Sequence, residues 1–376
     1  MKTETWKEIQ MTKQITVGIV GQGRSGRDIH GVYLCQDERF KIVAAADAIA
    51  ERRQRAAREY GCATYATHAE LLRHKGLDLV VNASFSHQHT SVTNDILATG
   101  RHVVCEKPLA RNVAMVDEMI AAAKKSGRVF AVFQQSRYAP YFQQVRKVID
   151  SGVLGRIVQI SIAFNGHGRR WDWQTLQEMH GGHMMNTGPH PLDQALTLYG
   201  EGMPDVRCWM DRSDDNFTGD AENHVKIVLS GKGKPVIEVE VSSCCAYPGS
   251  TYQVYGTCGG MKASGNNTAE WRYFNPQTAA PLKLNREPLA QADGTPSYCV
   301  ESLEWKSCKW PETGTDTAAG YVAARPDTNM TGEFYGMLHR TLTTGAPLEI
   351  TPEQVRKQIA VMEECRRQNP HIYPTA

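Results

Sequence analysis

Residues 15–26, ITVGIVGQGRSG, decide the fold of this chain. The first half of the stretch, Ile15–Val20, is a short run of β-branched and apolar residues that is typical of a buried strand. Three glycines follow at once: Gly21, Gly23 and Gly26. In a strand–turn–helix unit, such glycines permit the tight turn, let the backbone approach a pyrophosphate and let the helix pack on the strand. Arg24 and Ser25 are assigned to the cofactor site with these glycines, and the helix expected from Gly26 onward has free N–H groups at its start that can bind phosphate, so the stretch predicts a dinucleotide-binding unit.

The same alternation of strand and helix continues through the first third of the chain. Further strands are expected at Lys41–Ala46, Leu77–Ala83, His102–Cys105 and Val129–Phe133. Helices are expected at Gly26–Cys35, Ala50–Tyr60, Ala69–His74, Thr90–Thr99 and Val113–Lys125. This order predicts an α/β fold with a doubly wound parallel sheet of the Rossmann type.

Asp47 stands at the end of the second expected strand, roughly twenty residues beyond the glycine loop. A carboxylate at that point can accept hydrogen bonds from the hydroxyls of an adenosine ribose and would repel a 2′-phosphate. No arginine directly follows Asp47. The expected cofactor is therefore NAD rather than NADP.

The pattern changes after Pro140, where β-rich runs and loops replace the regular alternation. The expected elements are a helix at Tyr141–Asp150, a strand at Arg156–Phe164, a hairpin of Val225–Leu229 with Val236–Val241, and a last helix at Pro352–Arg367. The stretch Asn266–Pro326 is rich in Gly, Pro, Thr and Asn, which predicts long loops. We predict two domains: residues 1–138 bind the nucleotide, and residues 139–376 form an α+β domain with a mostly antiparallel open sheet that binds the substrate.

Charge and composition exclude several classes of protein. The 42 Lys and Arg against 40 Asp and Glu give a net charge of +2 without a long run of one sign, so no nucleic-acid partner is expected. Met1–Gln14 is polar, and no later run of apolar residues is long enough to cross a membrane. The ten cysteines show no disulfide or zinc-knuckle spacing, so free thiols and a cytoplasmic location are expected.

Glu106-Lys107-Pro108 follows the fourth expected strand. The segment resembles the Glu-Lys-Pro segment of the Gfo/Idh/MocA oxidoreductases, a family named for glucose-fructose oxidoreductase and inositol dehydrogenase. Other segments occur in a similar order: Gly21–Gly26, Ser84–His89, Arg137 with Pro140, Gly181–Asp193 and Ala346–Glu353. The resemblance implies that Lys107 sits beside the nicotinamide and the substrate, and that Pro108 follows a cis bond. Four residues are assigned to the cofactor site in this part of the chain: Ser84, His89, Glu106 and Lys107.

The second catalytic element of that family has an aspartate followed, after three residues, by a histidine. The similar segment in this chain is Gly181–His190, so His190 takes the place of the histidine and Asn186 that of the aspartate. The difference matters because an amide cannot relay a proton as a carboxylate can. Asn186 can still orient a hydroxyl.

The resemblance implies that the chain oxidises a secondary hydroxyl of a sugar, glycoside or cyclitol to a ketone by hydride transfer to NAD. His190 is the expected general base, because the unperturbed pKa of histidine, near 6.5, suits proton transfer around neutrality. Lys107 is the expected hydrogen-bond donor to the developing oxyanion. If burial lowers its pKa, Lys107 is the alternative base.

Residues 167–173, HGRRWDW, suit a carbohydrate, because tryptophan faces stack on sugar rings while Asp and His bind hydroxyls. The substrate residues are therefore predicted to be Arg137, Tyr138, His167, Trp171, Asp172, Trp173, Asn186 and His190. The two tryptophans and the aspartate would equally suit a core contact beside a turn. The histidines of this region match no metal-site spacing, and no metal is expected.

Two other functions stay open. Some members of the family use tightly held NAD to oxidise a sugar transiently, so that a glycosidic bond can be eliminated. A regulator that senses NAD(H) without catalysis would fit Asn186, although the pair Lys107 and His190 argues against it. The family is commonly dimeric or tetrameric, so a homo-oligomer is expected.

Overall fold

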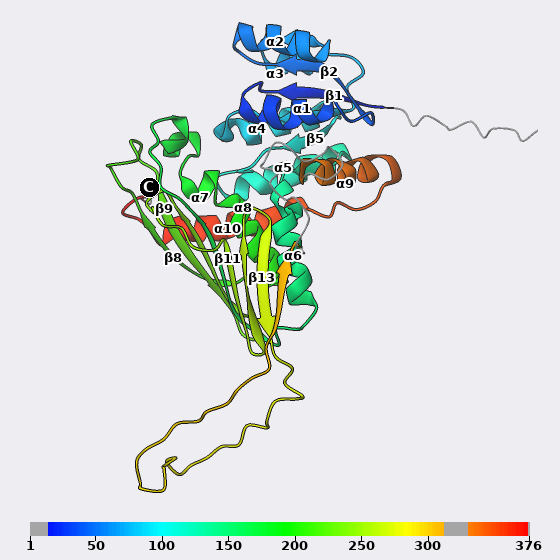
Figure 1. Cartoon of the computed structure of the whole chain (residues 1–376). Helices are drawn as coiled ribbons and strands as arrows, with labels where there is room; N and C mark the ends of the chain where they lie inside the picture. Colours follow the sequence, from blue (N-terminus) through cyan, green and yellow to red (C-terminus); the bar gives the residue numbers. More distant parts are fainter. Residues whose placement is uncertain (1–13, 312–329, 375–376) are drawn as a thin grey trace, which may run out of the picture.

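The structure, a computed structural model, describes residues 14–311 and 330–374. One sheet is built from the first third of the chain and a second from later strands, and helices from the C-terminal part lie between them (Figure 1). The predicted polar character of residues 1–13 concerns a segment outside the described residues.

The first sheet is parallel throughout and has the strand order β3-β2-β1-β4-β5-β6. Its strands are β1 (Ile15–Val20), β2 (Phe40–Ala46), β3 (Ala63–Tyr65), β4 (Leu79–Asn82), β5 (His102–Cys105) and β6 (Phe130–Val132). The predicted doubly wound sheet is confirmed, with one additional short strand at the edge, β3. The strand order changes direction at β1, and loops that diverge at such a point leave a crevice at the carboxyl ends of the strands.

The helices between these strands lie close to their predicted positions. They are η1 (Arg24–Gly31), α1 (Val32–Leu34), α2 (Ala50–Tyr60), α3 (His68–Leu71), η2 (Ser86–Gln88), α4 (His89–Ala98) and α5 (Val113–Ser126). The first helix opens with wide, π-type turns and begins two residues earlier than predicted. A capping box of Thr67 and Glu70 starts α3 one residue before its predicted range, and α3 ends three residues earlier than predicted.

The second sheet has eight strands in the order β14-β13-β12-β11-β7-β10-β9-β8. They are β7 (Ile157–Asn165), β8 (Asp205–Asp211), β9 (His224–Ser230), β10 (Val236–Ser242), β11 (Tyr252–Gly256), β12 (Gly259–Ser264), β13 (Thr268–Tyr273) and β14 (Lys306–Trp310). Only β7 and β10 pair in parallel among the described strands of this sheet. The mostly antiparallel sheet and the β9–β10 hairpin are confirmed.

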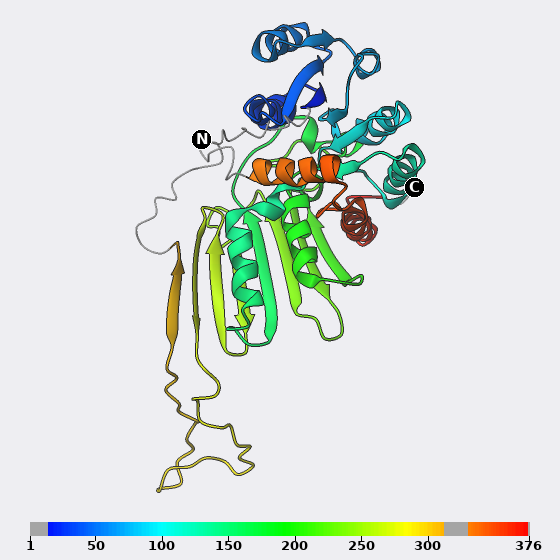
Figure 2. The ribbon, with the colours of Figure 1, turned by 90° about the vertical axis from the view of Figure 1, so that its right-hand side faces the viewer.

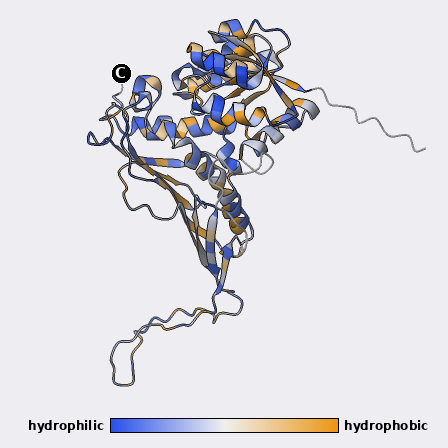
Figure 3. Cartoon of the chain, turned by 45° about the horizontal axis from the view of Figure 1, so that its top comes forward, coloured by the Kyte–Doolittle hydropathy of each residue, from blue (hydrophilic) through white to orange (hydrophobic). Residues whose placement is uncertain are grey.

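Helices cover one face of the second sheet (Figure 2). They are α6 (Pro140–Asp150), α8 (Pro189–Tyr199) and α10 (Pro352–Arg367). Thr351 forms a capping box with Gln354 and starts α10 where the sequence predicts it. Helix α10 buries Val355, Ile359 and Met362 on one side, and Figure 3 shows both hydrophobic and hydrophilic residues along the helices. Such a two-sided helix packs its apolar face against a sheet.

Helix α9 (Met330–Thr344) packs against the nucleotide-binding part, although it comes from the C-terminal third of the chain. The ring of Tyr335 stacks on Tyr33 with centroids 5.3 Å apart, and it also contacts Phe40 and Phe133. This helix was not predicted, because its apolar residues meet partners about 200 to 300 residues earlier in the sequence. The division at residue 138 stays a prediction.

The loops expected over Asn266–Pro326 are a wrong prediction for β13 and β14, which pair there as antiparallel strands. Trp271 and Trp310 pack against the core from this pair, so both side chains hold an edge of the sheet. Between the strands, residues 274–305 leave the sheet as an extended arm (Figures 1 and 2). The remainder of the stretch, 312–326, lies outside the described residues.

The ten cysteines all lie within the described residues. All ten cysteines are free, and Cys105, Cys208 and Cys365 are buried among apolar side chains. Across residues 14–311 and 330–374, no helix combines the length and the hydrophobicity that a membrane crossing demands.

Candidate active site

The predicted cofactor residues lie at one edge of the first sheet. Gly21 follows β1, Asp47 follows β2, Ser84 comes after β4 and Glu106 follows β5. Because these strands are parallel, their carboxyl ends meet at the same edge, where open α/β sheets bind their ligands. The four strand ends therefore lie together at the edge where sheets of this kind form their ligand-binding crevice.

The glycine loop is shaped to receive a phosphate. Gly21 has a φ of +88°, and a Cβ atom there would collide with the main-chain oxygen of Ala83. A Cβ atom at Gly26 would collide with the carbonyl oxygen of Gly21, so the turn and the close helix contact both require glycine. No side chain caps η1 behind Gly23, which leaves the N–H groups at Arg24 and Ser25 available to an anion. The loop fits the pyrophosphate of a dinucleotide.

Asp47 fastens the glycine loop to the end of β2. Its Oδ2 accepts a hydrogen bond from the N–H of Gln22 at 2.8 Å, and its Oδ1 accepts one from the N–H of Ile49 at 2.8 Å. Arg52 lies beside it, with Nη1 3.5 Å from Oδ2. Sequence reasoning missed Arg52 because it is five residues further on and returns to the strand end on the first turn of α2. The candidate ribose site therefore contains an acid and a nearby arginine.

Ser84 and His89 occupy different depths of the β4 loop. The Ser84 Oγ donates to the side-chain oxygen of Asn82 at 2.7 Å and is partly exposed. His89 is 1 % exposed, and its ring nitrogens face the carbonyl oxygens of Pro108 at 2.8 Å and Ser84 at 3.2 Å. Burial lowers the pKa of His89. His89 therefore lies behind the loop and joins it to the Lys107-Pro108 turn, so its effect on a cofactor passes through those two segments.

Glu106 is buried and supports the turn that carries Lys107. Burial favours its neutral form, but hydrogen bonding and charge from His30, together with Lys107, lower the pKa of Glu106 to about 2. The carboxylate accepts from His30 Nε2 at 3.1 Å and from the Lys107 N–H at 3.0 Å. His30 Nδ1 lies 2.7 Å from the hydroxyl of Tyr335 in α9. The buried carboxylate is thus held by His30 and by the main chain of Lys107, and Tyr335 holds His30 in turn.

Lys107 reaches across from the first sheet toward α7 (His183–Asn186). The Lys107–Pro108 peptide bond is cis, as the family resemblance implies. Nζ donates a hydrogen bond to the main-chain oxygen of Asn186 at 2.9 Å. Burial lowers the pKa of Lys107, and the charges of Arg24 and Arg170 act in the same direction against Glu106. The ammonium therefore lies where the nucleotide-binding part meets the second sheet's helices.

His190 stands in the first turn of α8, within the electrostatic reach of Lys107. Its Nδ1 lies 3.0 Å from the Oγ of Ser136 in η3 (Gln135–Tyr138), and Nε2 has no protein partner among residues 14–311 and 330–374. Burial lowers the pKa of His190 to about 3, and the charges of Lys107 and Arg24 contribute. A neutral imidazole with one nitrogen oriented and the other free is the form that accepts a proton.

Sequence reasoning missed the residues that orient His190. The main-chain oxygen of Ser136 accepts from Gln194 Nε2 at 2.7 Å, and Gln194 Oε1 accepts from the hydroxyl of Tyr252 at 2.6 Å. Gln194 and Tyr252 are fully buried. These polar groups come from η3, α8 and β11, and only tertiary structure brings them together.

Asn186 receives hydrogen bonds at its main chain and its side chain. Besides the Lys107 contact, its Oδ1 accepts from Gln174 Nε2 at 3.0 Å. Gln174 Oε1 accepts in turn from Arg170, whose guanidinium also binds both oxygens of Asp172. The predicted segment 167–173 thus contributes to the site through Arg170, a residue that was not among the predicted contacts.

Arg137 and Tyr138 make their contacts with protein groups. The Arg137 guanidinium binds the buried carboxylate of Asp193 through two hydrogen bonds, at 2.9 and 2.5 Å. Tyr138 donates its hydroxyl to Glu349 at 2.9 Å. Both side chains therefore tie η3, the segment that carries Ser136, to helix α8 and to the chain before α10.

The other predicted substrate residues differ in how they are held. The ring of Trp173 contacts Phe85 edge-on at 5.1 Å, so it joins η4 (Trp173–Thr175) to the loop after β4. Trp171 is 75 % exposed, and His167 is exposed beside Cys244. Asp172 caps η4 and pairs with Arg170. Trp173 is the tryptophan that the structure brings to the crevice loops.

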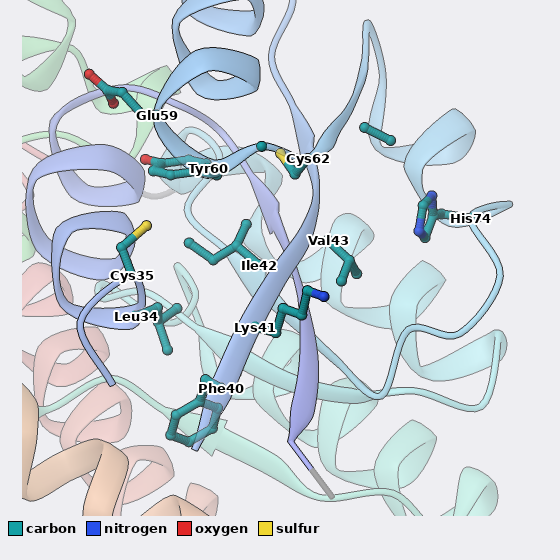
Figure 4. A pocket seen from close by; sticks show the side chains of 12 residues that line it. Leu34, Cys35, Phe40, Lys41, Ile42, Val43, Glu59, Tyr60, Cys62 and His74 are labelled. Atoms are coloured by element: carbon teal, nitrogen blue, oxygen red, sulfur yellow. The ribbon is translucent and has the colours of Figure 1, made fainter. Parts of the chain in front are cut away.

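A cavity of about 540 Å³ lies elsewhere in the described part of the chain. Figure 4 shows its lining at the start of β2 and the end of α2, with Phe40, Tyr60, Cys62 and His74 around it. These are the amino-terminal ends of the strands, on the edge of the sheet away from Gly21 and Asp47. We place the site at the crevice because the convergent polar groups lie there. Among residues 14–311 and 330–374, no cluster of His, Cys, Asp and Glu is arranged to hold a metal ion.

Comparison with known proteins agrees with this geometry. A family model described as the oxidoreductase family with an NAD-binding Rossmann fold matches residues 15–134, and the GFO/IDH/MocA C-terminal domain matches residues 142–262. D-glucoside 3-dehydrogenase of Escherichia coli (strain K12) is 33 % identical over 199 residues, which are 52 % of this chain and 56 % of that protein. The chain thus spans little more than half the length of that relative.

Two further similarities cover more of the chain. Inositol 2-dehydrogenase of Salmonella paratyphi B (strain ATCC BAA-1250 / SPB7) is 26 % identical over 237 residues, 62 % of this chain and 68 % of that protein. The WlbA dehydrogenase from Bordetella pertussis, solved with NADH and UDP-GlcNAcA, superposes with a TM-score of 0.75 at 20 % identity over 96 % of each chain. The glycine loop, the parallel sheet and both matching family models agree, and the chain belongs to the GFO/IDH/MocA family of NAD-binding oxidoreductases.

Proposed function

We propose that the chain oxidises a secondary hydroxyl of a sugar, glycoside or cyclitol to a ketone, with NAD as hydride acceptor. The observation that carries the proposal is the geometry at His190: Ser136 Oγ lies 3.0 Å from Nδ1, Nε2 has no protein partner among the described residues, and the charge of Lys107 acts on the ring. Such an imidazole is neutral at physiological pH and can take a proton from a hydroxyl. The names of the relatives, a glucoside dehydrogenase and an inositol dehydrogenase, support the substrate class.

The chain's own groups divide the work of the reaction. His190 takes the hydroxyl proton, and the Lys107 ammonium donates a hydrogen bond to the oxygen that gains negative charge. Asn186 orients the substrate oxygen, while Trp173 offers an apolar face beside the crevice loops. Bound NAD supplies the acceptor for the hydride that leaves the carbinol carbon. Gly21, Gly23, Gly26 and the start of η1 would hold its pyrophosphate.

The test is NADH absorbance at 340 nm with NAD and a panel of hexoses, inositols, sugar acids and glycosides, followed in parallel by release of the aglycone from each glycoside. Net NADH formation on one class supports the dehydrogenase. Aglycone release without net NADH would instead establish transient oxidation with elimination of the glycosidic bond. Silence in both assays, with NAD binding demonstrated, would contradict catalysis and favour an NAD(H)-sensing regulator.

Asp47→Ser is expected to weaken NAD binding by about tenfold to a hundredfold, because hydrogen bonds to a charged group contribute about 1.5–3 kcal/mol. NADP should be affected less, since the substitution removes the repulsion of its 2′-phosphate and leaves Arg52 in place. The readout is the ratio of the two dissociation constants, which is insensitive to a general loosening of the loop. Asp47→Asn, which keeps one acceptor oxygen, is the matched control. Equal weakening of both cofactors would contradict a ribose role for Asp47.

We also propose that the chain works as a cytoplasmic homo-oligomer, with the arm at residues 274–305 engaged by a neighbouring copy. Four apolar side chains on the arm are almost fully exposed: Leu282 (95 %), Leu284 (82 %), Tyr298 (88 %) and Val300 (96 %). Apart from the bridge between Ala290 and Pro296, residues 274–305 form no strand, and exposed apolar patches usually mark contact sites. Contact with a neighbouring copy would bury these side chains.

Replacing those four side chains by serine is therefore expected to reduce the molar mass in solution by a whole-number factor. Size-exclusion chromatography with light scattering measures it. Serine at the interleaved positions Lys283, Asn285, Cys299 and Glu301 is the matched control and should keep the parent mass. A parent protein that is monomeric would contradict a role of the arm in assembly. The same holds if the variant with all four serines keeps the parent's molar mass.

A further inference from the structure

A chain of hydrogen bonds with a fixed direction ends at the side chain of Asn186. Arg170 donates to Oε1 of Gln174, and Nε2 of Gln174 donates to Oδ1 of Asn186 at 3.0 Å. A guanidinium can only donate, so the oxygen of the Gln174 amide must face it. The Gln174 nitrogen then faces Asn186 and requires an acceptor there. The orientation of both amides follows from the arginine at the start of the chain.

The guanidinium at the start of this chain is itself held in place. Asp172 accepts from Arg170 Nε and Nη2 at distances from 2.9 to 3.1 Å. Asp172 also accepts the N–H of Gln174 at 2.8 Å, which fixes the backbone of η4 under the amide. Rotation of Gln174 would place its amide nitrogen against a cation. The stable arrangement is therefore the one in which Arg170 donates to Gln174 Oε1 and Gln174 Nε2 donates to Asn186 Oδ1.

The fixed orientation leaves the Nδ2 group of Asn186 as a free donor. Nδ2 has no protein partner in the described part of the chain, and it is not sealed from solvent. The same residue receives the Lys107 ammonium on its main-chain oxygen. Two donors, one an amide and one a cation, thus lie together where the resemblance places a carboxylate acceptor.

We infer that Asn186 is a specificity-determining residue that donates Nδ2 to a substrate oxygen able only to accept, either the ketone of a keto-sugar or the carboxylate of a sugar acid. Gln174 and Arg170 are positioning residues for that donor. The inference rests on the proposed function, since it names the substrate feature read by the same crevice. An aspartate at this position would repel such an oxygen and favour a hydroxyl, which can donate.

The test uses matched ligands: a sugar that the enzyme oxidises, its keto-sugar product and the corresponding sugar acid. Binding to the NADH-loaded full chain is measured by calorimetry, and NADH affinity is measured for every variant. The wild type is expected to bind the keto-sugar or the acid about tenfold or more tighter than the parent sugar. The tighter of the two identifies the source of the accepting oxygen.

Two substitutions distinguish the effect of reversing a hydrogen bond from the effect of disturbing the structure. Asn186→Asp should reverse the preference. Gln174→Glu keeps the Arg170 partner and nearly the same shape, but it cannot donate to Oδ1, so it should abolish the preference although Asn186 is unchanged. Gln253→Glu, on the exposed residue of β11, adds the same charge elsewhere and should keep it.

An unchanged preference in both Asn186→Asp and Gln174→Glu, with ligands still bound, would overturn this inference alone. A wild type that binds all three ligands equally would do the same. If no sugar of the panel is oxidised although NADH binds, the proposed function itself fails, and this inference falls with it.

Discussion

Lys107→Ala is expected to lower kcat by about a hundredfold to a thousandfold, the usual effect of removing one donor to a developing oxyanion. Nζ of Lys107 lies 2.9 Å from the main-chain oxygen of Asn186 and acts electrostatically on His190. The pyrophosphate loop lies on a different strand end, so NAD affinity should change little. Steady-state kinetics with the substrate found in the panel, together with a fluorescence titration of NAD, measure the two effects separately.

Lys107→Met is the more stringent variant, because it keeps most of the apolar stem while removing the charge. Lys125→Ala, an exposed lysine in the last turn of α5, is the control and should leave both quantities unchanged. Turnover that survives in Lys107→Met would remove the ammonium from the mechanism. Because burial lowers the pKa of Lys107, the wild type should also lose activity on the alkaline side below the ordinary lysine value of about 10.4.

The first sheet was predictable because local signals agree with the tertiary fold there. Ile15–Val20 and His102–Cys105 are β-branched runs buried on both faces, and they became β1 and β5 with the predicted bounds. Edge strand β3 was missed because its three residues, Ala63–Tyr65, are only partly buried and carry no apolar run. Pattern reasoning identifies buried strands more reliably than edges.

The second half of the chain shows where composition misleads. The stretch after Asn266 is rich in turn residues, yet β13 pairs with β14 within it. Trp271 and Trp310 pack these two strands against the core. The strands and the arm between them have a similar composition. Only the pairing of β13 with β14 in the folded chain distinguishes them. Helix α9 was missed for a similar reason, since Tyr335 is buried by partners from the first sheet's helices.

The site divides along the same line. The positions of Asp47 and Lys107 at the carboxyl edge of the parallel sheet were predictable from the strand pattern, and their part in binding stays a prediction. Ser136 and Gln174 were not predictable, because each acts through a side chain 54 or 12 residues away. Arg170 lies inside the predicted segment 167–173, but the prediction chose the neighbouring tryptophans as substrate contacts instead. A local sequence pattern does not indicate which distant side chains will contact each other in the folded chain.

His190→Ala should reduce kcat by about a hundredfold to ten-thousandfold, the range for loss of a positioned general base. Ser136→Ala leaves the imidazole in place but frees Nδ1, so a smaller loss, about tenfold, is expected from wrong tautomers and misdirection of the ring. Both variants should bind NAD as the parent does. If Ser136→Ala is as inactive as His190→Ala, the serine has a role beyond orientation.

The pH profile distinguishes His190 from an ordinary histidine base. A base works in its neutral form, so activity is lost only when the pH falls through the pKa. Burial and the neighbouring cations lower the pKa of His190 to about 3, and kcat/KM should therefore show no acid limb near pH 6.5. An acid limb near pH 6.5 that disappears in His190→Ala would mean that the working site solvates this ring. The same limb retained in the variant would assign it to another group and leave His190 as the base.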